Sequence, residues 1–217
     1  MRITKLIENK IELGLNDSYC AILGETPSKG ARSPILWNAC FEKLNIPSFF
    51  YPFDVKPNKL EEVVSSLKED SNFIGGAIAV PYKDAIIPYL DIVEDEAEKI
   101  GAVNLIYKKD YKLIGSNTDG LGFVSSIATL LNSNLEEFCL GNKAIIFGTG
   151  GAAKACAVYL SKSLGKDGKI FIVGRKEDKI NSLVDKCRNY SQASALSLNE
   201  IAKILPTVQI LVNATSL

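Results

Sequence analysis

An apolar strand that runs directly into a glycine-rich turn is the feature that most constrains the fold of this chain. Residues 145–147 are Ile-Ile-Phe, a run typical of a strand buried on both faces of a parallel sheet. Residues 148–151 are Gly-Thr-Gly-Gly, and a helix is predicted from Ala152 to about Leu164. The free amide groups at the start of such a helix attract a diphosphate, so the pattern is a variant of the dinucleotide-binding fingerprint. The residues expected to approach the diphosphate are Gly148, Thr149, Gly150, Gly151 and Ala152.

The same turn has a simpler interpretation, because glycines also occur where a helix packs closely on a strand. The next strand strengthens the case for a nucleotide. Residues 169–173 are apolar and rich in β-branched side chains, which predicts the second strand of a βαβ unit. NAD-binding folds usually place an acidic residue at the end of this strand to bind the ribose hydroxyls. Here Arg175 and Lys176 follow Gly174 instead.

These cations favour NADP over NAD as the cofactor. Arg175 and Lys179 are four residues apart, so a helix that begins here would put them on one face. Two cations can hold a 2′-phosphate, and the planar guanidinium of arginine suits that group well. The alternative interpretation is a solvated basic helix start, with Glu177 and Asp178 as its acidic first-turn residues.

Composition excludes several classes of chemistry. The chain has 217 residues and no histidine, so proton transfer must fall to Lys, Asp, Glu, Tyr or Cys, and no metal site is predicted. The 25 basic and 25 acidic residues balance, which gives no support to binding of nucleic acid or of a membrane surface. No signal peptide or membrane span is expected. The scattered cysteines, with no Cys-x-x-Cys pair, predict reduced thiols and a cytoplasmic location.

Strands and helices alternate along the chain, which predicts an α/β fold with two domains. Strands are predicted at 19–23, 48–52, 73–80, 103–107, 111–114 and 208–212, the last as a third strand of the nucleotide-binding domain. Helices are predicted at 34–44, 59–69, 82–89, 94–100 and 120–131. Ser33 is the expected N-cap of the first helix, and residues 108–110 the expected hairpin turn. The polar residues 132–142 would lead into the nucleotide-binding domain.

A lysine and an aspartate in the first half of the chain have the properties of a proton-transfer pair. Lys83 follows Val80-Pro81-Tyr82 at the end of an apolar strand, and Asp119 lies at the start of a helix, where the macrodipole favours its charged form. A carboxylate beside an amine orients it and biases its charge. A surface lysine and a helix-capping aspartate are the alternative interpretation.

Several short motifs occur in order along the chain. They are Ser33-Pro34, Pro81-Tyr82-Lys83, Gly101-Ala102-Val103-Asn104, Asn117-Thr118-Asp119-Gly120, the Gly148–Ala152 turn, Gly174-Arg175-Lys176 and Asn213-Ala214-Thr215. In this order they resemble the shikimate dehydrogenase family over nearly the whole chain. The resemblance implies an N-terminal α/β substrate domain at residues 1–120 and a C-terminal Rossmann-type nucleotide-binding domain at residues 121–217. Because the family continues beyond the last motif, the second domain is expected to be truncated at its C-terminus.

The resemblance also implies roles for the matched residues. Lys83 would be the catalytic lysine and Asp119 its partner, and both would contact the substrate. Ser33 and Asn104 would bind the substrate as well, and Ser28, outside the matched motifs, is expected to supply another substrate contact. The implied cofactor contacts are Gly148, Thr149, Gly150, Gly151, Ala152, Arg175, Lys176, Lys179, Asn213 and Thr215. The implied activity is the reversible, NADP-dependent reduction of 3-dehydroshikimate to shikimate in aromatic amino-acid (chorismate) biosynthesis, by a monomer or homodimer.

The chain departs from the family pattern on the substrate side. Ala31 stands where the family has a substrate-binding serine, and Ala77 and Ala79 replace an amide and a hydroxyl. A pocket that hydrogen-bonds a hydroxylated ring acid loses affinity when those partners are missing. The departures leave two other functions open: an enzyme acting on another ring hydroxy acid, of the quinate or aminoshikimate type, or a catalytically idle nucleotide-binding paralogue.

Overall fold

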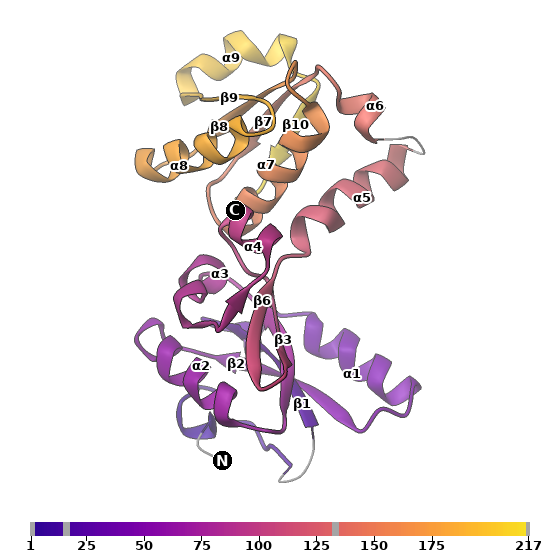
Figure 1. Cartoon of the computed structure of the whole chain (residues 1–217), viewed down its shortest axis with the longest axis vertical. Helices are drawn as coiled ribbons and strands as arrows, with labels where there is room; N and C mark the ends of the chain where they lie inside the picture. The colour runs from indigo at the N-terminus through magenta and orange to yellow at the C-terminus, as the bar shows by residue number, and fades with distance from the viewer. Residues whose placement is uncertain (1–2, 15–17, 132–134, 216–217) are drawn as a thin grey trace. The chain divides into compact units, whose positions relative to one another are not determined.

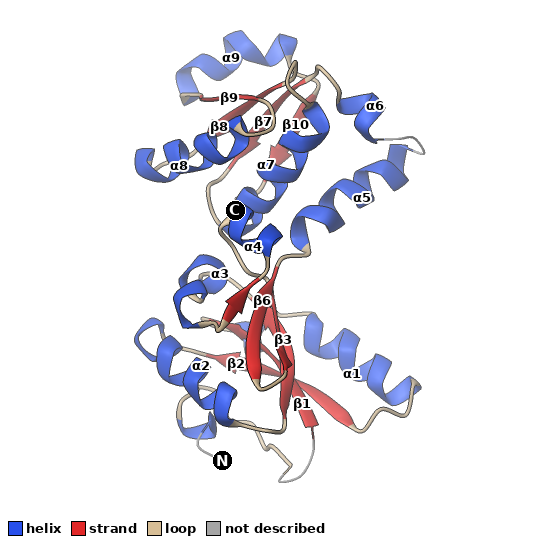
Figure 2. Ribbon diagram, in the orientation of Figure 1, coloured by secondary structure: helices blue, strands red, loops and turns tan. Residues whose placement is uncertain are grey.

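The computed structural model describes residues 3–14, 18–131 and 135–215. The chain divides into two compact units (Figure 1). The first unit holds residues 1–98 and 103–117, and the second holds residues 99–102 and 118–217. Both units are mixed α/β structures, which confirms the predicted fold class (Figure 2).

The first unit is built on a six-stranded sheet with the order β2-β1-β3-β5-β6-β4. Its strands are β1 (Ser18–Gly24), β2 (Ser48–Asp54), β3 (Phe73–Ile78), β4 (Ile92–Val93), β5 (Leu105–Lys109) and β6 (Lys112–Ser116). Its helices are α1 (Ser33–Lys43), α2 (Leu60–Glu69), α3 (Tyr82–Ala85) and the start of α4 (Asp95–Ile100), with short 3-10 helices at Ile3–Lys5, Pro27–Lys29, Pro57–Lys59 and Ile87–Tyr89. Strands β1, β2 and β3 are parallel, whereas β5 runs antiparallel to both β3 and β6.

Helix α2 shows how the first unit builds its core. Leu60, Val63, Val64 and Leu67 recur at the helical spacing and are 0–3% exposed, so one face of α2 is apolar. These side chains belong to one buried cluster with aromatic residues from β1, β2 and β3, namely Tyr19, Phe53 and Phe73. Burial of each such aliphatic side chain contributes about 1.5–3 kcal/mol.

The second unit is built on a parallel sheet with the order β10-β7-β8-β9. Its strands are β7 (Lys143–Phe147), β8 (Lys169–Val173), β9 (Gln192–Ala195) and β10 (Ile210–Asn213). Its helices are α5 (Asp119–Leu131), α6 (Leu135–Cys139), α7 (Gly151–Leu164), α8 (Glu177–Arg188) and α9 (Ile201–Ile204), with 3-10 helices at Leu198–Glu200 and Leu205–Thr207. The strand order reverses between β7 and β10, and ligands of open α/β sheets bind outside the carboxyl ends of strands at such a point.

Two strands escaped prediction. Strand β4 has two residues, and Gln192-Ala193-Ser194-Ala195 of β9 contains no β-branched residue, so neither gives a period-two signal. The segment predicted at 208–212 as a third strand is therefore the fourth, β10. The prediction of one continuous helix at 82–89 is also wrong, because α3 ends at Ala85 and a separate 3-10 helix follows.

Two local predictions in the first unit are corrected as well. Ser33 is not an N-cap, because α1 already begins at Ser33, Arg32 occupies the cap position, and no side-chain capping bond forms there. The hairpin turns at Asp110 and Tyr111, which both have positive φ, rather than at 108–110. The second unit begins at Thr118, and α5 packs against α7, so residues 132–142 lie inside that unit; residues 132–134 fall outside the described part of the chain.

Within the described residues, no helix combines the length and apolar character needed to cross a membrane. Nor do His, Cys, Asp or Glu side chains in that part of the chain gather into a group of three that could hold a metal ion.

Gly76 should be indispensable to the first unit. A Cβ atom at this position would lie 1.7 Å from the carbonyl oxygen of Ala21, in the neighbouring strand β1. Gly76→Ala should therefore lower the free energy of unfolding by about 3 kcal/mol or more. Trp37, the single tryptophan, lies in the first unit and reports its denaturation by fluorescence.

Gly30→Ala is the matched control in the same unit. An added Cβ would meet nothing within 4 Å, so the change should stay within about 0.5 kcal/mol. Equal denaturation curves for the two variants would contradict the packing of β3 against β1.

Candidate functional site

The turn between β7 and α7 accepts only glycine at its first position. Gly148 has φ +116, a conformation that residues with a Cβ rarely adopt. A Cβ there would also lie 2.8 Å from the carbonyl oxygen of Ala214. The amide of Gly148 donates to the carbonyl of Val173 at 2.9 Å, which fixes the turn to the end of β8. Both the backbone conformation and the packing against Ala214 therefore require glycine at this position.

Helix α7 begins immediately after this turn. Gly150 is its N-cap residue, in an extended conformation, and its first turn carries no acidic residue among the described side chains. No side-chain capping bond forms there either, within the same part of the chain. The first amide groups of this 14-residue helix therefore have no capping carboxylate in the described part of the chain, and a helix start of this kind attracts an anion.

The segment after β10 lies beside the glycine turn. The amide of Ala214 donates to the carbonyl of Phe147 at 2.9 Å, which joins the ends of β10 and β7. The Asn213 carboxamide oxygen accepts the amide of Thr215 at 3.1 Å and its hydroxyl at 2.7 Å, so the side chain holds its own turn closed. The structure thus brings the predicted cofactor residues 148–152 and 213–215 to one place, where the strand order reverses.

The basic residues after β8 lie at the same edge of the sheet, but not as predicted. Helix α8 begins at Glu177, and Lys176 before it is extended (φ −113, ψ 115). Arg175 is therefore outside the helix, and the prediction that Arg175 and Lys179 share a helix face is wrong. Two acids, Glu177 and Asp178, occupy the first turn and complement the helix dipole there. All three cations are exposed.

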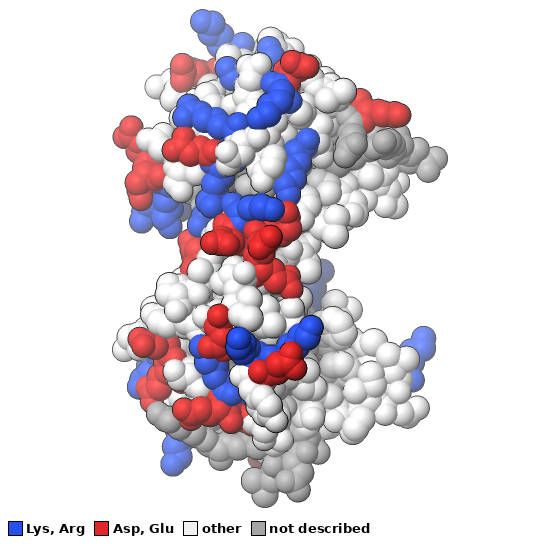
Figure 3. All heavy atoms as spheres, viewed as in Figure 1, with Lys and Arg blue, Asp and Glu red and all other residues white. Residues whose placement is uncertain are grey.

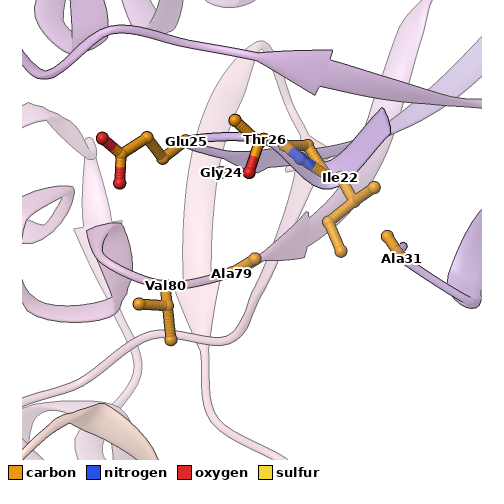
Figure 4. A pocket seen from close by; sticks show the side chains of 8 residues that line it. Ile22, Gly24, Glu25, Thr26, Ala31, Ala79 and Val80 are labelled. Carbon is orange, nitrogen blue, oxygen red and sulfur yellow. The ribbon is translucent and has the colours of Figure 1, made fainter. Parts of the chain in front are cut away.

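The first unit contains a pocket of about 420 Å³ at the carboxyl ends of β1 and β3 (Figure 4). Its lining residues are Ile22, Gly24, Glu25, Thr26, Pro27, Ala31, Ala79 and Val80. Two of the three alanines noted in the sequence, Ala31 and Ala79, contribute methyl groups to it, and Figure 4 shows both side chains at the pocket. Ala77 is not among the described residues that line the pocket. The hydroxyl of Thr26 and the carboxylate of Glu25 are its polar side-chain groups.

Ser28 lies near this pocket in sequence but is engaged elsewhere. Its amide and hydroxyl donate to the Asp54 carboxylate at 2.8 and 2.5 Å, respectively. Asp54 ends β2 and is only 7% exposed, so a buried carboxylate fixes the loop after β1. In the described part of the chain, Ser28 does not line the pocket, and Ser33 does not either. Their roles in substrate binding stay predictions.

Lys83 and Asn104 are held close together by the backbone of the first unit. The amide of Val103 donates to the carbonyl of Lys83 at 2.6 Å, and the carbonyl of Asn104 accepts the amide of Ile78 at 2.8 Å. The predicted catalytic lysine and the predicted substrate amide are therefore tied to adjoining backbone segments. Both side chains are half-buried and have interaction partners.

Tyr82, next to Lys83, is sequestered. Its hydroxyl donates to the carbonyl of Val55, and its side chain is 2% exposed. Burial and, to a smaller extent, the negative charge of Glu25 raise the pKa of Tyr82. This tyrosine is therefore a structural donor, and the catalytic role predicted within the Pro81-Tyr82-Lys83 motif stays with Lys83.

Asp119 is the first residue of α5 and belongs to the second unit, whereas Lys83 belongs to the first. Their predicted pairing stays a prediction. Sequence reasoning missed Glu25, Thr26 and Val80 as pocket residues. Their position directly after β1 and β3 could have revealed them, because parallel strands present ligand-binding loops at their carboxyl ends.

A Rossmann-type unit with a glycine turn at its switch point, together with an α/β unit that has its own pocket, defines a class of two-unit α/β proteins. Comparisons narrow the class. Residues 22–106 match the family model described as "Shikimate dehydrogenase substrate binding domain", and residues 130–217 match "Shikimate / quinate 5-dehydrogenase". The chain belongs to the shikimate dehydrogenase family.

Two curated relatives are named "Shikimate dehydrogenase (NADP(+))". The protein from Caldanaerobacter subterraneus subsp. tengcongensis is 37% identical over 192 residues, which are 88% of this chain and 65% of that protein. The protein from Desulforamulus reducens is 34% identical over 211 residues, 92% of this chain and 70% of that protein. The chain therefore spans about two thirds of the length of these relatives.

Two solved structures show the same fold. Shikimate dehydrogenase from Thermus thermophilus, in complex with NADP(H) and shikimate, superposes with a TM-score of 0.73 at 25% identity and covers 91% of this chain and 68% of that one. The enzyme from Listeria monocytogenes, in complex with shikimate and NAD, gives a TM-score of 0.78 at 26% identity. The match covers 96% of this chain and 72% of that one.

Proposed function

We propose that this chain carries out the reversible, NADP-dependent reduction of 3-dehydroshikimate to shikimate, or of a closely related ring acid. The observation that carries the proposal is the convergence of the glycine turn and the Asn213–Thr215 turn at the switch point of the second sheet. A Cβ on Gly148 would meet the carbonyl group of Ala214, so glycine at this position lets the two turns lie against each other. The curated relatives' names and the ligands of the Thermus structure agree with this cofactor and substrate.

Each predicted residue has a task in this proposal. NADP, when bound, supplies or accepts the hydride. The ammonium group of Lys83 delivers a proton to the substrate oxygen during reduction and takes it back during oxidation. The hydride and this proton together convert the ketone into the alcohol. Asp119 is the catalytic partner of Lys83, and Asn104 orients the ring. The amide groups of the Gly148–Ala152 turn hold the diphosphate.

A second candidate is an enzyme for another ring hydroxy acid, of the quinate or aminoshikimate type. The specific observation that favours it is the lining of the first-unit pocket, where Ala31 and Ala79 present methyl groups. The family membership and the retained Lys83 and Asp119 weigh against an idle paralogue. On the face shown in Figure 3, basic and acidic side chains are interspersed. The absence of nucleic-acid binding, a cytoplasmic location and a monomeric or homodimeric state stay predictions.

The cofactor assignment predicts a preference for NADP over NAD. Arg175 is exposed at the end of β8, where its guanidinium can hold a 2′-phosphate. Each charged hydrogen bond to that phosphate is worth about 1.5–3 kcal/mol, so Arg175→Ala should weaken NADP binding about tenfold or more and leave NAD binding unchanged. Calorimetric titration of both cofactors measures this. Arg188→Ala, at the far end of α8, is the control and should change neither affinity. Equal affinities in the wild-type chain would contradict the assignment.

The catalytic assignment predicts that Lys83→Ala lowers turnover about a hundredfold or more, the usual effect of losing a general acid or base. The affinity for NADP should barely change, because Lys83 belongs to the other unit. Lys109→Ala, in the exposed hairpin of the same unit, is the matched control. Turnover is measured as NADP reduction with shikimate and, separately, with quinate. A Lys83→Ala chain that kept most of its turnover would show that another group transfers the proton.

The pocket lining predicts that shikimate is a poor substrate with a high KM. Each hydrogen bond lost to the ring acid costs about 0.5–1.5 kcal/mol, so restoring Ala31→Ser and Ala79→Thr together should raise kcat/KM for shikimate about tenfold to a hundredfold. Ala85→Ser, an exposed change on α3, should leave kcat/KM as it is. An ordinary micromolar KM in the wild-type chain would mean that other side chains supply the missing hydrogen bonds.

A further inference from the structure

Four residues, 99–102, belong to the second unit although both neighbouring stretches of chain belong to the first. Ile100 and Ala102 are fully buried and share a cluster with Ala155 and Val158 of α7. Tyr159 and Tyr190 pack against the same cluster. The apolar side chains of Ile100 and Ala102 therefore pack on helix α7.

Two lysine side chains of the second unit hold the backbone of this segment. Nζ of Lys154 donates to the carbonyl of Gly101 at 3.2 Å, and Nζ of Lys186 donates to the carbonyl of Lys99 at 3.0 Å. These carbonyls lie at the C-terminal end of α4, where a helix leaves acceptors without intrahelical partners and favours cations. Lys186 also runs along Gly101, since a Cβ there would lie 3.1 Å from its Cε. Gly101 has φ +72, so a glycine suits both the conformation and the contact.

The residue that follows this segment supports Lys83. The chain returns to the first unit at Val103, whose amide donates to the carbonyl of Lys83 at 2.6 Å. Asn104, one residue further, accepts from Ile78 in β3. The chain therefore passes directly from the segment that packs on α7 to the residues bonded to Lys83 and Ile78.

Of the two lysines that hold residues 99–102, Lys154 lies close to the glycine turn in the sequence. It lies in the first turn of α7, and its amide donates to the carbonyl of Gly150 at 2.9 Å. A lysine three residues after a glycine turn would be expected to contact a diphosphate. Its ammonium group is directed to Gly101 instead, at the C-terminal end of a different helix.

We propose that Lys154 is a positioning residue: by holding the Gly101 carbonyl on α7, it fixes the 99–102 segment and, through Val103, the backbone that carries Lys83. The effect of Lys154 on turnover rests on the proposed function, whereas its effect on the backbone does not.

The test compares three variants of the full chain. Lys154→Met removes the ammonium group but keeps the length of the side chain, and Lys154→Arg keeps a donor. Lys166→Met is the matched control, because Lys166 makes the same kind of bond, to the carbonyl of Asn189 at 2.7 Å, beyond the end of α8. Amide hydrogen exchange at Val103, the Kd for NADP and kcat are measured for each.

Lys154→Met should raise the exchange rate at Val103 about tenfold and lower kcat by a similar factor, with the Kd for NADP changed less than about twofold. Lys154→Arg should restore both values, and Lys166→Met should leave all three as in the wild type. Unchanged exchange at Val103 in Lys154→Met would overturn the proposal. A large loss of NADP affinity with unchanged exchange would also overturn it, and would make Lys154 a phosphate ligand. If the wild-type chain turned over no ring acid, the proposed function would fail, while exchange at Val103 would still decide the role of Lys154.

Discussion

The contact between the backbone at Gly148 and the carbonyl of Ala214 is the constraint on which the nucleotide side of this structure depends. It exists because β7 and β10 are neighbours in a parallel sheet whose order reverses between them. At that point two chain segments leave the sheet in the same direction, and a side chain on Gly148 would separate them. Helix α7 begins directly after this turn, and the described part of the chain gives its start neither an acidic residue nor a side-chain cap, a pattern typical of diphosphate sites.

Close backbone packing also determines the structure of the first unit, here between neighbouring strands. Gly75 and Gly76 in β3 let this strand lie against β1 and β5 with no side chain in between. The pocket at the ends of β1 and β3 is then lined by small groups, including Gly24, Ala31 and Ala79. Backbone packing sets where the pocket is, and the alanine methyl groups form part of its lining.

Much of the fold could be predicted from the sequence, because its long apolar strands and amphipathic helices carry strong periodic signals. Strand β8 begins and ends at the predicted residues, and α2 and α7 begin within one residue of theirs. The failures lie where the signal is weak or where a tertiary contact decides. The short, polar β9 has no β-branched side chain, and the start of α8 at Glu177 follows the acidic first turn rather than the spacing of the cations. The pocket residues Glu25 and Thr26 follow the end of β1, so their place after a strand, rather than their residue types, is the signal that could have revealed them.

The Gly101-Ala102-Val103-Asn104 motif illustrates what a linear pattern conceals. In the sequence it is one segment with one expected role, contact with the substrate through Asn104. In the structure its first two residues are held by the second unit and its last two by the first. Gly101 accepts from Lys154, Ala102 is buried against α7, Val103 donates to Lys83, and Asn104 joins β3. Four consecutive residues thus form four different contacts. Glycine and alanine at the first two positions are explained by φ and by packing, whereas the role predicted for Asn104 is contact with the substrate, so substitutions along this motif should separate stability from specificity.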